Sequence, residues 1–358
     1  GNAYVTEANA VSIAANVGSL DLATTNGTLN VGAVNGITGV TATTGNVTLS
    51  GTANSGNGIY IGNSITASNG TVTLTGTTSS ATSANIASPD AGVKSVAAVT
   101  AKNINMTASA TAVNGGLLGY YGAGNADNFI ATEQLNLTGA AAGTGNGFYS
   151  YIGTFSAGTG ISITGTSHAG QAIGLVNGVT MTNGSTGNIA ITGTSDDANK
   201  QGIGLRGITL TNGGGNTVLT AVNGVIATDA GNPAWNTGSH TNTITSNGTG
   251  YVHVTAGNGS ATNTASIDGS VLSINQNGNA GVVVSTSGIG NVIVPKVINA
   301  GTGDIVVAAG TAIEAGTGTG GQVLTLAGNT LTQTNAMPGK TYVYSGQASS
   351  TGALSNLS

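Results

Sequence analysis

The sequence predicts an all-β fold, a parallel β-helix (β-solenoid) in which each coil contributes three short strands. A five-residue motif alternates apolar, polar, apolar and hydroxyl side chains and then ends on Gly or Ala, as a strand with one buried face does. The motif returns about every 28 residues, a period typical of solenoids, whose repeats bury their apolar faces against their neighbours. No stretch of the chain shows helical periodicity.

The repeat motif occurs seven times in the first two-thirds of the chain. It occupies residues 47–51, 72–76, 104–108, 135–139, 161–165, 189–193 and, without its first apolar residue, 217–221. Because alternate side chains of a strand share one face, we expect the middle apolar residues to stack as a core ladder. This ladder comprises Leu49, Leu74, Met106, Leu137, Ile163, Ile191 and Leu219.

The hydroxyl residue that follows each middle position is expected on the outer face of the strand. The resulting outer hydroxyl ladder comprises Ser50, Thr75, Thr107, Thr138, Thr164, Thr192 and Thr220. Thr forms strands well and solvates an outward face, which is the structural explanation of this ladder. An ice-binding surface would need a second regular column of Thr side chains beside this ladder. The outward-facing position two residues before each ladder residue instead varies among Thr, Asn, Ser and Ala.

Two further strands per coil are predicted from shorter alternating segments. A second strand precedes the motif at 40–42, 65–67, 99–101, 130–132, 155–157, 179–181 and 208–210, and a third precedes that at 59–61, 173–175 and 203–205. Beyond residue 225 the pattern loosens but continues as the pairs Val252/Val254, Leu272/Ile274, Val282/Val284, Val292/Val294, Ile305/Val307 and Leu324/Leu326. The chain therefore holds roughly 12–13 coils over residues 1–335, followed at 336–358 by a strand and a Ser/Gly-rich tail that caps the coils or leads to a further module.

Composition restricts the function. Of 358 residues 62 are Gly, only 5% are charged, and the net charge is −5. The few Lys and Arg residues are scattered, which argues against nucleic acid as a partner. No cysteine is present, and no apolar run approaches the roughly 20 residues that span a bilayer, so we expect no disulfide and no membrane span. The start at Gly1, without an initiator Met or a signal peptide, suggests a processed product or part of a longer protein.

Residues suited to catalysis are sparse. The acidic pair Asp196 and Asp197, close to Lys200 and Arg206, is the one cluster of charge in the sequence. We interpret these two residues as solvated side chains of a loop in preference to the paired catalytic carboxylates of a glycosidase. The three histidines are far apart and fit no metal-ligand spacing. We therefore expect a protein that is not an enzyme and that needs no cofactor or metal.

Aromatic residues are few and unevenly placed. Alignment of the third strands puts Tyr60 level with Tyr151 and places other aromatic residues in the corresponding part of their coils. The candidate aromatic patch for a glycan or a partner comprises Tyr60, Tyr120, Tyr121, Tyr149 and Tyr151. Exposed aromatic rings suit stacking on sugars or packing against a partner. The structural alternative is that these rings cover a corner of the coil or fill the core.

The pattern Gly-Asn-[Val/Ile]-x-[Leu/Ile]-[Thr/Ser]-Gly at 45–51 and 187–193 resembles the repeats of filamentous-haemagglutinin-type adhesins of Gram-negative bacteria. Segments 303–311 and 339–346 are similar to the part that closes the β-helix in such adhesins. The resemblance implies a right-handed β-helix, secretion across the outer membrane, and a role in adhesion, aggregation or biofilm. The N-terminal secretion domain of that family, with its Asn-Pro motifs, has no counterpart here.

Three functions follow from these observations. The first is a non-enzymatic adhesin or structural rod at the bacterial cell surface, with cell-surface or matrix polysaccharide as its partner. The second is a subunit of an extracellular filament or surface layer, with other copies of the chain as partners. The third and least favoured is an enzyme that degrades polysaccharide, which would require acidic residues of adjacent coils to meet near Asp196 and Asp197.

Overall fold

The computed structural model describes residues 1–79, 90–111, 117–119, 127–196, 200–228, 241–257, 266–287, 290–310, 321–326 and 328–345. The chain divides into two compact units, Gly1–Gly174 and Leu175–Ser358, which we describe separately. In the part described, all regular secondary structure is β-strand. The fold is therefore all-β, with an architecture of the β-solenoid or parallel β-helix kind.

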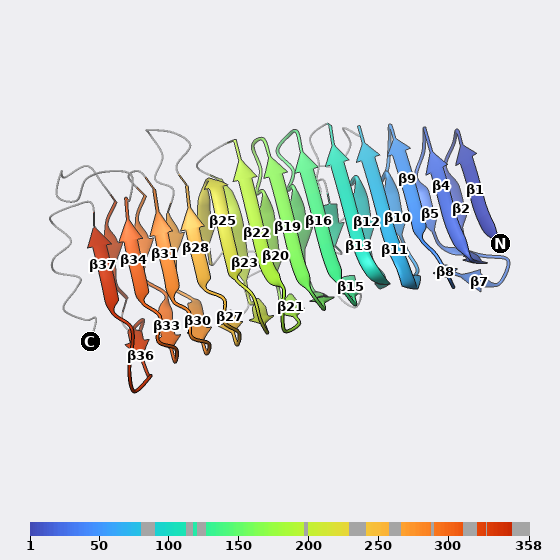
Figure 1. Cartoon of the computed structure of the whole chain (residues 1–358). Helices are drawn as coiled ribbons and strands as arrows, with labels where there is room; N and C mark the ends of the chain where they lie inside the picture. The colour runs from blue at the N-terminus through green and yellow to red at the C-terminus, as the bar shows by residue number, and fades with distance from the viewer. Residues whose placement is uncertain are drawn as a thin grey trace. The chain divides into compact units, whose positions relative to one another are not determined.

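The first unit contributes strands to a larger and a smaller parallel sheet (Figure 1). Its larger-sheet strands are β1 (Asn2–Glu7), β3 (Ala15–Val17), β4 (Ser19–Thr24), β8 (Val40–Ala42), β9 (Val47–Ala53), β11 (Ile65–Thr78), β13 (Val99–Ala110), β15 (Asp127–Ala131), β16 (Gln134–Ala141), β18 (Gly153–Ala157) and β19 (Gly160–Ser167). Its smaller-sheet strands are β2 (Val11–Ile13), β5 (Leu29–Val31), β10 (Ile59–Ile61), β12 (Val93–Ser95), β14 (Leu117–Gly119) and β17 (Phe148–Ser150). A short antiparallel hairpin joins β6 (Ala33–Val34) to β7 (Ile37–Thr38).

The second unit is built in the same way. Its larger-sheet strands are β21 (Thr180–Asn183), β22 (Asn188–Ser195), β24 (Thr209–Asn212), β25 (Thr217–Asn223), β27 (Asn242–Ser246), β28 (Val252–Ala256), β30 (Leu272–Gln276), β31 (Val282–Thr286), β33 (Lys296–Asn299), β34 (Ile305–Ala309), β36 (Leu331–Gln333) and β37 (Thr341–Ser345). Its smaller-sheet strands are β23 (Gln201–Arg206), β26 (Val225–Ala227), β29 (Ile267–Asp268), β32 (Val292–Ile293) and β35 (Val323–Leu324). One more strand, β20 (Ile173–Val176), crosses the boundary between the units.

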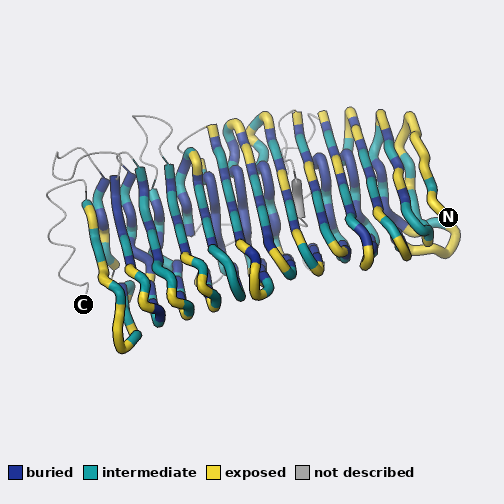
Figure 2. Tube along the Cα trace, viewed as in Figure 1, coloured by how far each residue is buried: buried dark blue, intermediate teal, exposed yellow. Residues whose placement is uncertain are grey.

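Register places the repeat motifs directly beside one another. Leu49 of β9 pairs with Leu74 of β11, Leu74 with Met106 of β13, and Met106 with Leu137 of β16. Leu137 in turn pairs with Ile163 of β19. These side chains are almost fully buried, and Figure 2 shows buried and more exposed positions alternating along the same strands. The apolar column follows from the period of two, since a slip of one residue would turn every one of these side chains to solvent.

The second unit has an apolar column of the same kind. Ile191 of β22 pairs with Leu219 of β25, which pairs with Val254 of β28. Val254 pairs with Val284 of β31, and Val284 pairs with Val307 of β34. All of these residues are fully buried.

The Gly that ends the repeat motif points inward at a narrow corner. A β-carbon at Gly51 would lie against the carbonyl group of Gly58, just before β10, and one at Gly76 would lie against the carbonyl group of Gly92, just before β12. A side chain at either position would collide with backbone that cannot easily move. The motif therefore ends on a small residue because two strands of one repeat approach each other closely there.

Two predicted registers are wrong by one residue. Residues 130–132 were expected to put Ile130 in the core, but Phe129 takes that position and Ile130 is 40% exposed. Phe129 pairs with Phe155 of β18, and their rings stack with centroids 5.4 Å apart, which buries more apolar surface than Ile130 would. Likewise Val323 is buried in β35, whereas the expected core pair Leu324 and Leu326 is exposed.

Buried amide side chains close several turns of the second unit. The Asn212 side-chain amide donates to the carbonyl oxygens of Gly215 and Asn216, both at 2.9 Å, and its oxygen accepts a bond from the Asn183 amide at 3.0 Å. Asn299 donates in the same way to the Gly303 carbonyl at 2.6 Å. These bonds tie the ends of the strands to the turns that follow them and give the buried amide groups partners.

Candidate functional site

The outer face of the first unit carries an uncharged array of hydroxyl and amide groups. The expected hydroxyl ladder is in register from Ser50 through Thr75, Thr107 and Thr138 to Thr164. A second outer column lies beside this ladder, formed by the residue two positions earlier on each strand. Its members, in the same register, are Thr48, Thr73, Asn105, Asn136 and Ser162.

Hydrogen bonds join neighbouring strands of this array. The Asn136 amide donates to the Asn105 side-chain oxygen at 2.9 Å, and the hydroxyls of Thr77 and Ser109 are 3.1 Å apart. Because polar groups recur on each strand, the array is a repeated surface and not a single cleft.

The corresponding outer positions of the second unit have a different chemistry. Val218 of β25 pairs with His253 of β28, which pairs with Val283 of β31. Val306 of β34 and Tyr342 of β37 continue this rank. The next outer rank keeps its hydroxyls at Thr192, Thr220, Thr255 and Ser285. An apolar and aromatic rank therefore runs beside a hydroxyl rank, with strands about 4.8 Å apart.

Strand β28 brings two rings and a hydroxyl group onto one line. Tyr251 lies immediately before the strand, and its ring centroid is 4.0 Å from that of His253 with the ring planes inclined by 30°. Tyr251 is 37% exposed, and His253 is partly buried between its two valine neighbours. Burial lowers the pKa of His253 from its ordinary value of 6.5, because it disfavours the charged imidazolium.

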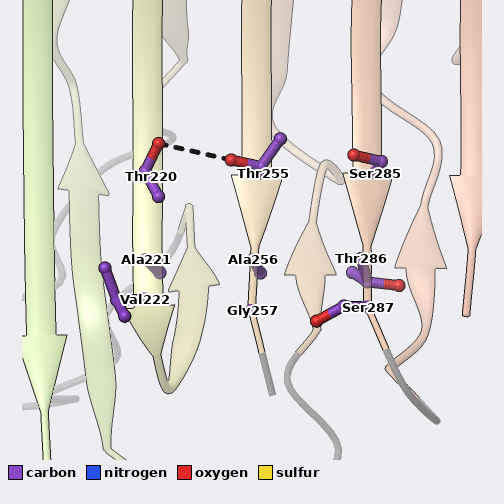
Figure 3. Close-up of a pocket in the computed structure, with 9 residues that line it drawn as sticks. All are labelled: Thr220, Ala221, Val222, Thr255, Ala256, Gly257, Ser285, Thr286 and Ser287. Carbon is purple, nitrogen blue, oxygen red and sulfur yellow. Dashed lines mark hydrogen bonds between the residues drawn. The ribbon is translucent and has the colours of Figure 1, made fainter. Parts of the chain in front are cut away.

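A hollow of about 280 Å³ lies at the C-terminal ends of β25, β28 and β31. Figure 3 shows the lining residues in rows across the three strands. The hydroxyl row is Thr220, Thr255 and Ser285, and the Thr255 hydroxyl is 3.3 Å from that of Thr220. In the lowest row of the view, Gly257 lies between Val222 and Ser287. Ala221, Ala256 and Thr286 complete the lining, none of which is charged.

The aromatic patch predicted in the first unit differs in its members. Tyr149, and not Tyr151, shares an outer rank with Tyr60, because Tyr60 pairs with Lys94, Lys94 with Leu118, and Leu118 with Tyr149. The alignment was wrong because Tyr151 lies beyond the end of β17, in a bend.

The rings of Tyr60 and Tyr149 are partly covered. Each lies close to a glycine, Gly62 and Gly174 respectively, whose missing side chain makes room for it. Tyr120 and Tyr121 fall outside the residues that the structure describes.

The structure describes only part of the charge cluster predicted at Asp196, Asp197, Lys200 and Arg206. Asp196 lies exposed just after β22, and Asp197 falls outside the described residues. Lys102 and Glu133 form an ion pair of 3.2 Å between half-exposed side chains. No group of three or more His, Asp or Glu side chains is close enough to hold a metal ion among the residues described.

Sequence reasoning missed the row on β28. Its signal was present, because Val252 and Val254 were predicted to point inward and the residues on either side must then point outward. What the sequence did not reveal was which residues of other repeats lie beside them, since the lateral neighbours Val218 and Val283 are separated from His253 by loops of unequal length.

Among the residues described, no helix is both long and apolar enough to cross a membrane. No family model matches the chain, and neither a curated protein nor a solved structure matches it.

Proposed function

We propose that the chain is a non-enzymatic, extracellular adhesive solenoid of a bacterial cell surface, which makes repeated contacts with polysaccharide along its outer faces. The resemblance of its repeats to filamentous-haemagglutinin-type adhesins is consistent with this function. The observation that carries the proposal is the uncharged hydroxyl and amide array on β9, β11, β13, β16 and β19. Such groups both donate and accept hydrogen bonds, as the hydroxyls of a sugar chain do.

We further propose that the fold is a right-handed parallel β-helix of 12–13 coils with three strands in each. Pairing in the first unit supports three strands per coil. The successive segments 59–61, 65–66 and 72–78 pair respectively with β5, β8 and β9 of the preceding repeat. An experimental density map that traces the backbone would test both the hand and the number of strands.

Adhesion that depends on uncharged groups should not depend on salt. The full chain would be immobilised, and its retention of beads coated with neutral polysaccharide would be measured from about 0.01 M to about 1 M NaCl, over which the screening length falls roughly tenfold. We expect retention to stay constant over this range. Retention that disappears at high salt would contradict the proposed chemistry, and no retention on any polysaccharide-coated or cell surface would contradict the function.

A second candidate, a filament subunit, is favoured by one observation. Val5 of β1 continues the buried position of Leu22 in β4, yet Val5 is 45% exposed and Leu22 only 1%. An exposed apolar edge of this kind favours the addition of another strand. Sedimentation velocity at several concentrations separates the two functions, because a filament subunit grows with concentration and a monomeric adhesin does not.

A further inference from the structure

The outer surface around β28 combines the two kinds of group that a sugar chain presents. A pyranose ring has an apolar face of C–H groups and an edge of hydroxyls. Tyr251 and His253 form a pair of rings packed against each other at one end of the row, of which Tyr251 is 37% exposed, and Thr255 offers a hydroxyl two residues further along the same strand. Apolar and aromatic surface with a few placed polar groups is the usual composition of a ligand site.

The neighbouring strands widen this row into a surface. Val218 and Val283 flank His253, so that apolar side chains lie on both sides of the row. Thr220 and Ser285 flank Thr255 in the same way. The Ser285 hydroxyl makes no hydrogen bond to the part of the chain that the structure describes, and it is partly exposed at the rim of the hollow.

The length of the row suits a chain of several sugars rather than a single ring. Tyr251 and Gly257 are six residues apart on an extended backbone, which corresponds to about 20 Å. The row begins at the paired rings and ends in the hollow of about 280 Å³. A linear oligosaccharide would therefore lie along β28, with its last residue over Gly257.

Charge decides which sugars fit. None of the residues that line the hollow is charged, and the whole chain carries a net charge of −5. An anionic glycan would lose hydration at this surface and gain no cationic partner. The surface therefore favours a neutral glycan.

We propose that Tyr251, His253 and Thr255, together with the hollow at the end of β28, form a track that binds a neutral linear oligosaccharide. This inference rests on the proposed adhesive function and assigns it a principal site in the second unit. The rings stack against the apolar faces of the sugars, and the hydroxyl rank exchanges hydrogen bonds with their edges.

Titration calorimetry on the full chain tests the track. The probes are the neutral oligosaccharides cellohexaose, maltohexaose and mannohexaose, with an alginate hexasaccharide as the anionic comparator. We expect at least one neutral probe to bind more tightly than the anionic one. Loss of the stacked ring in Tyr251→Ala should weaken that binding roughly tenfold, and loss of one hydroxyl in Thr255→Val should weaken it severalfold.

Two matched variants control for general effects. Tyr4→Ala removes an exposed ring from β1, and Thr245→Val removes an outward hydroxyl from β27. Both should bind the probe as the unchanged protein does, and all four variants should keep the thermal midpoint of the parent.

The possible failures are distinguishable. If the neutral probe binds and neither Tyr251→Ala nor Thr255→Val weakens it, the track is wrong while the proposed function stands. If the parent protein binds none of the oligosaccharides and retains no polysaccharide-coated beads, the track and the proposed function are both wrong.

Discussion

The carboxyl group of Asp127 should make the stability of the protein depend on pH. Asp127 begins β15 and is completely buried. The Ser150 hydroxyl donates a hydrogen bond of 2.9 Å to its Oδ2, whereas its Oδ1 has no hydrogen-bond partner. Burial raises the pKa of Asp127 to about 7, although the bond from Ser150 and the residue's own backbone N–H act in the opposite direction.

The size of the effect follows from the difference between the folded and unfolded states. The pKa of Asp127 is about 7 in the folded protein against an ordinary value of 3.8. Between these two values the folded protein holds a proton that the unfolded chain releases, so the free energy of unfolding falls as pH rises. At about 1.4 kcal/mol per pH unit, this group lowers the free energy of unfolding by about 4 kcal/mol between pH 4 and pH 7, and by little more above pH 7.

The variant Asp127→Asn removes the titration and keeps a side-chain oxygen to accept the bond from Ser150. We expect it to have nearly the stability of the parent at pH 4 and to exceed it at pH 8 by up to about 4 kcal/mol. The assay is denaturant unfolding followed by circular dichroism at pH 4, 6 and 8. Asp21→Asn, which changes an exposed aspartate on β4, is the matched control and should leave the difference between pH 4 and pH 8 unchanged.

Parallel pH profiles for the parent and Asp127→Asn would refute this reasoning, because they would mean that the pKa of the carboxyl is the same in the folded and the unfolded protein. A direct measurement is the pH dependence of the side-chain ¹³C shift of Asp127. A midpoint near 4 would have the same meaning.

Three further outcomes are expected. Leu74→Ala, in the middle of the apolar column, should lower the free energy of unfolding by about 2–5 kcal/mol. Thr75→Ala, at the exposed neighbouring position, should stay within about 0.5 kcal/mol of the parent. Equal losses in the two variants would contradict the inward direction of Leu74. Asn212→Ala should cost roughly 1–3 kcal/mol, because Asn212 is fully buried and the variant loses its hydrogen bonds to the carbonyl oxygens of Gly215 and Asn216. The exposed Asn277→Ala should cost much less in the same denaturation assay. The titration midpoint of His253, measured by NMR, should lie below pH 6.5. Val283→Ser, which admits water beside the His253 ring, should move this midpoint upward. A midpoint at or above 6.5 in the parent would show that the ring is not desolvated.

Alternation alone was sufficient to place the residues of the core column. Leu49, Leu74 and Met106 lie in consecutive strands because a slip of one residue would expose them all. Alternation failed where two apolar residues are adjacent. The pair Phe129 and Ile130 satisfies either register, and contact with Phe155 in another repeat decides between them. The same ambiguity explains Val323 and Leu324, since a local pattern does not show which of them meets Val292.

The candidate site was harder to foresee because it depends on lateral contacts. The outward direction of His253 follows from its own strand, but the flanking Val218 and Val283 belong to strands on either side. The hollow is lined by residues of three strands, β25, β28 and β31, which are far apart in the sequence. Sequence patterns predict faces within a strand, whereas a site across strands requires the length of every intervening loop to be known.

The close approach at Gly51 and Gly76 has a consequence for tracing the ancestry of such repeats. The middle position of the motif accepts Leu, Ile or Met, so its identity can drift without disturbing neighbouring coils. The final position is Gly or Ala in every copy, and at Gly51 and Gly76 even a β-carbon would meet the main chain opposite. A diverged coil is therefore better recognised by the small residue that ends its strand than by the apolar residues that fill its interior.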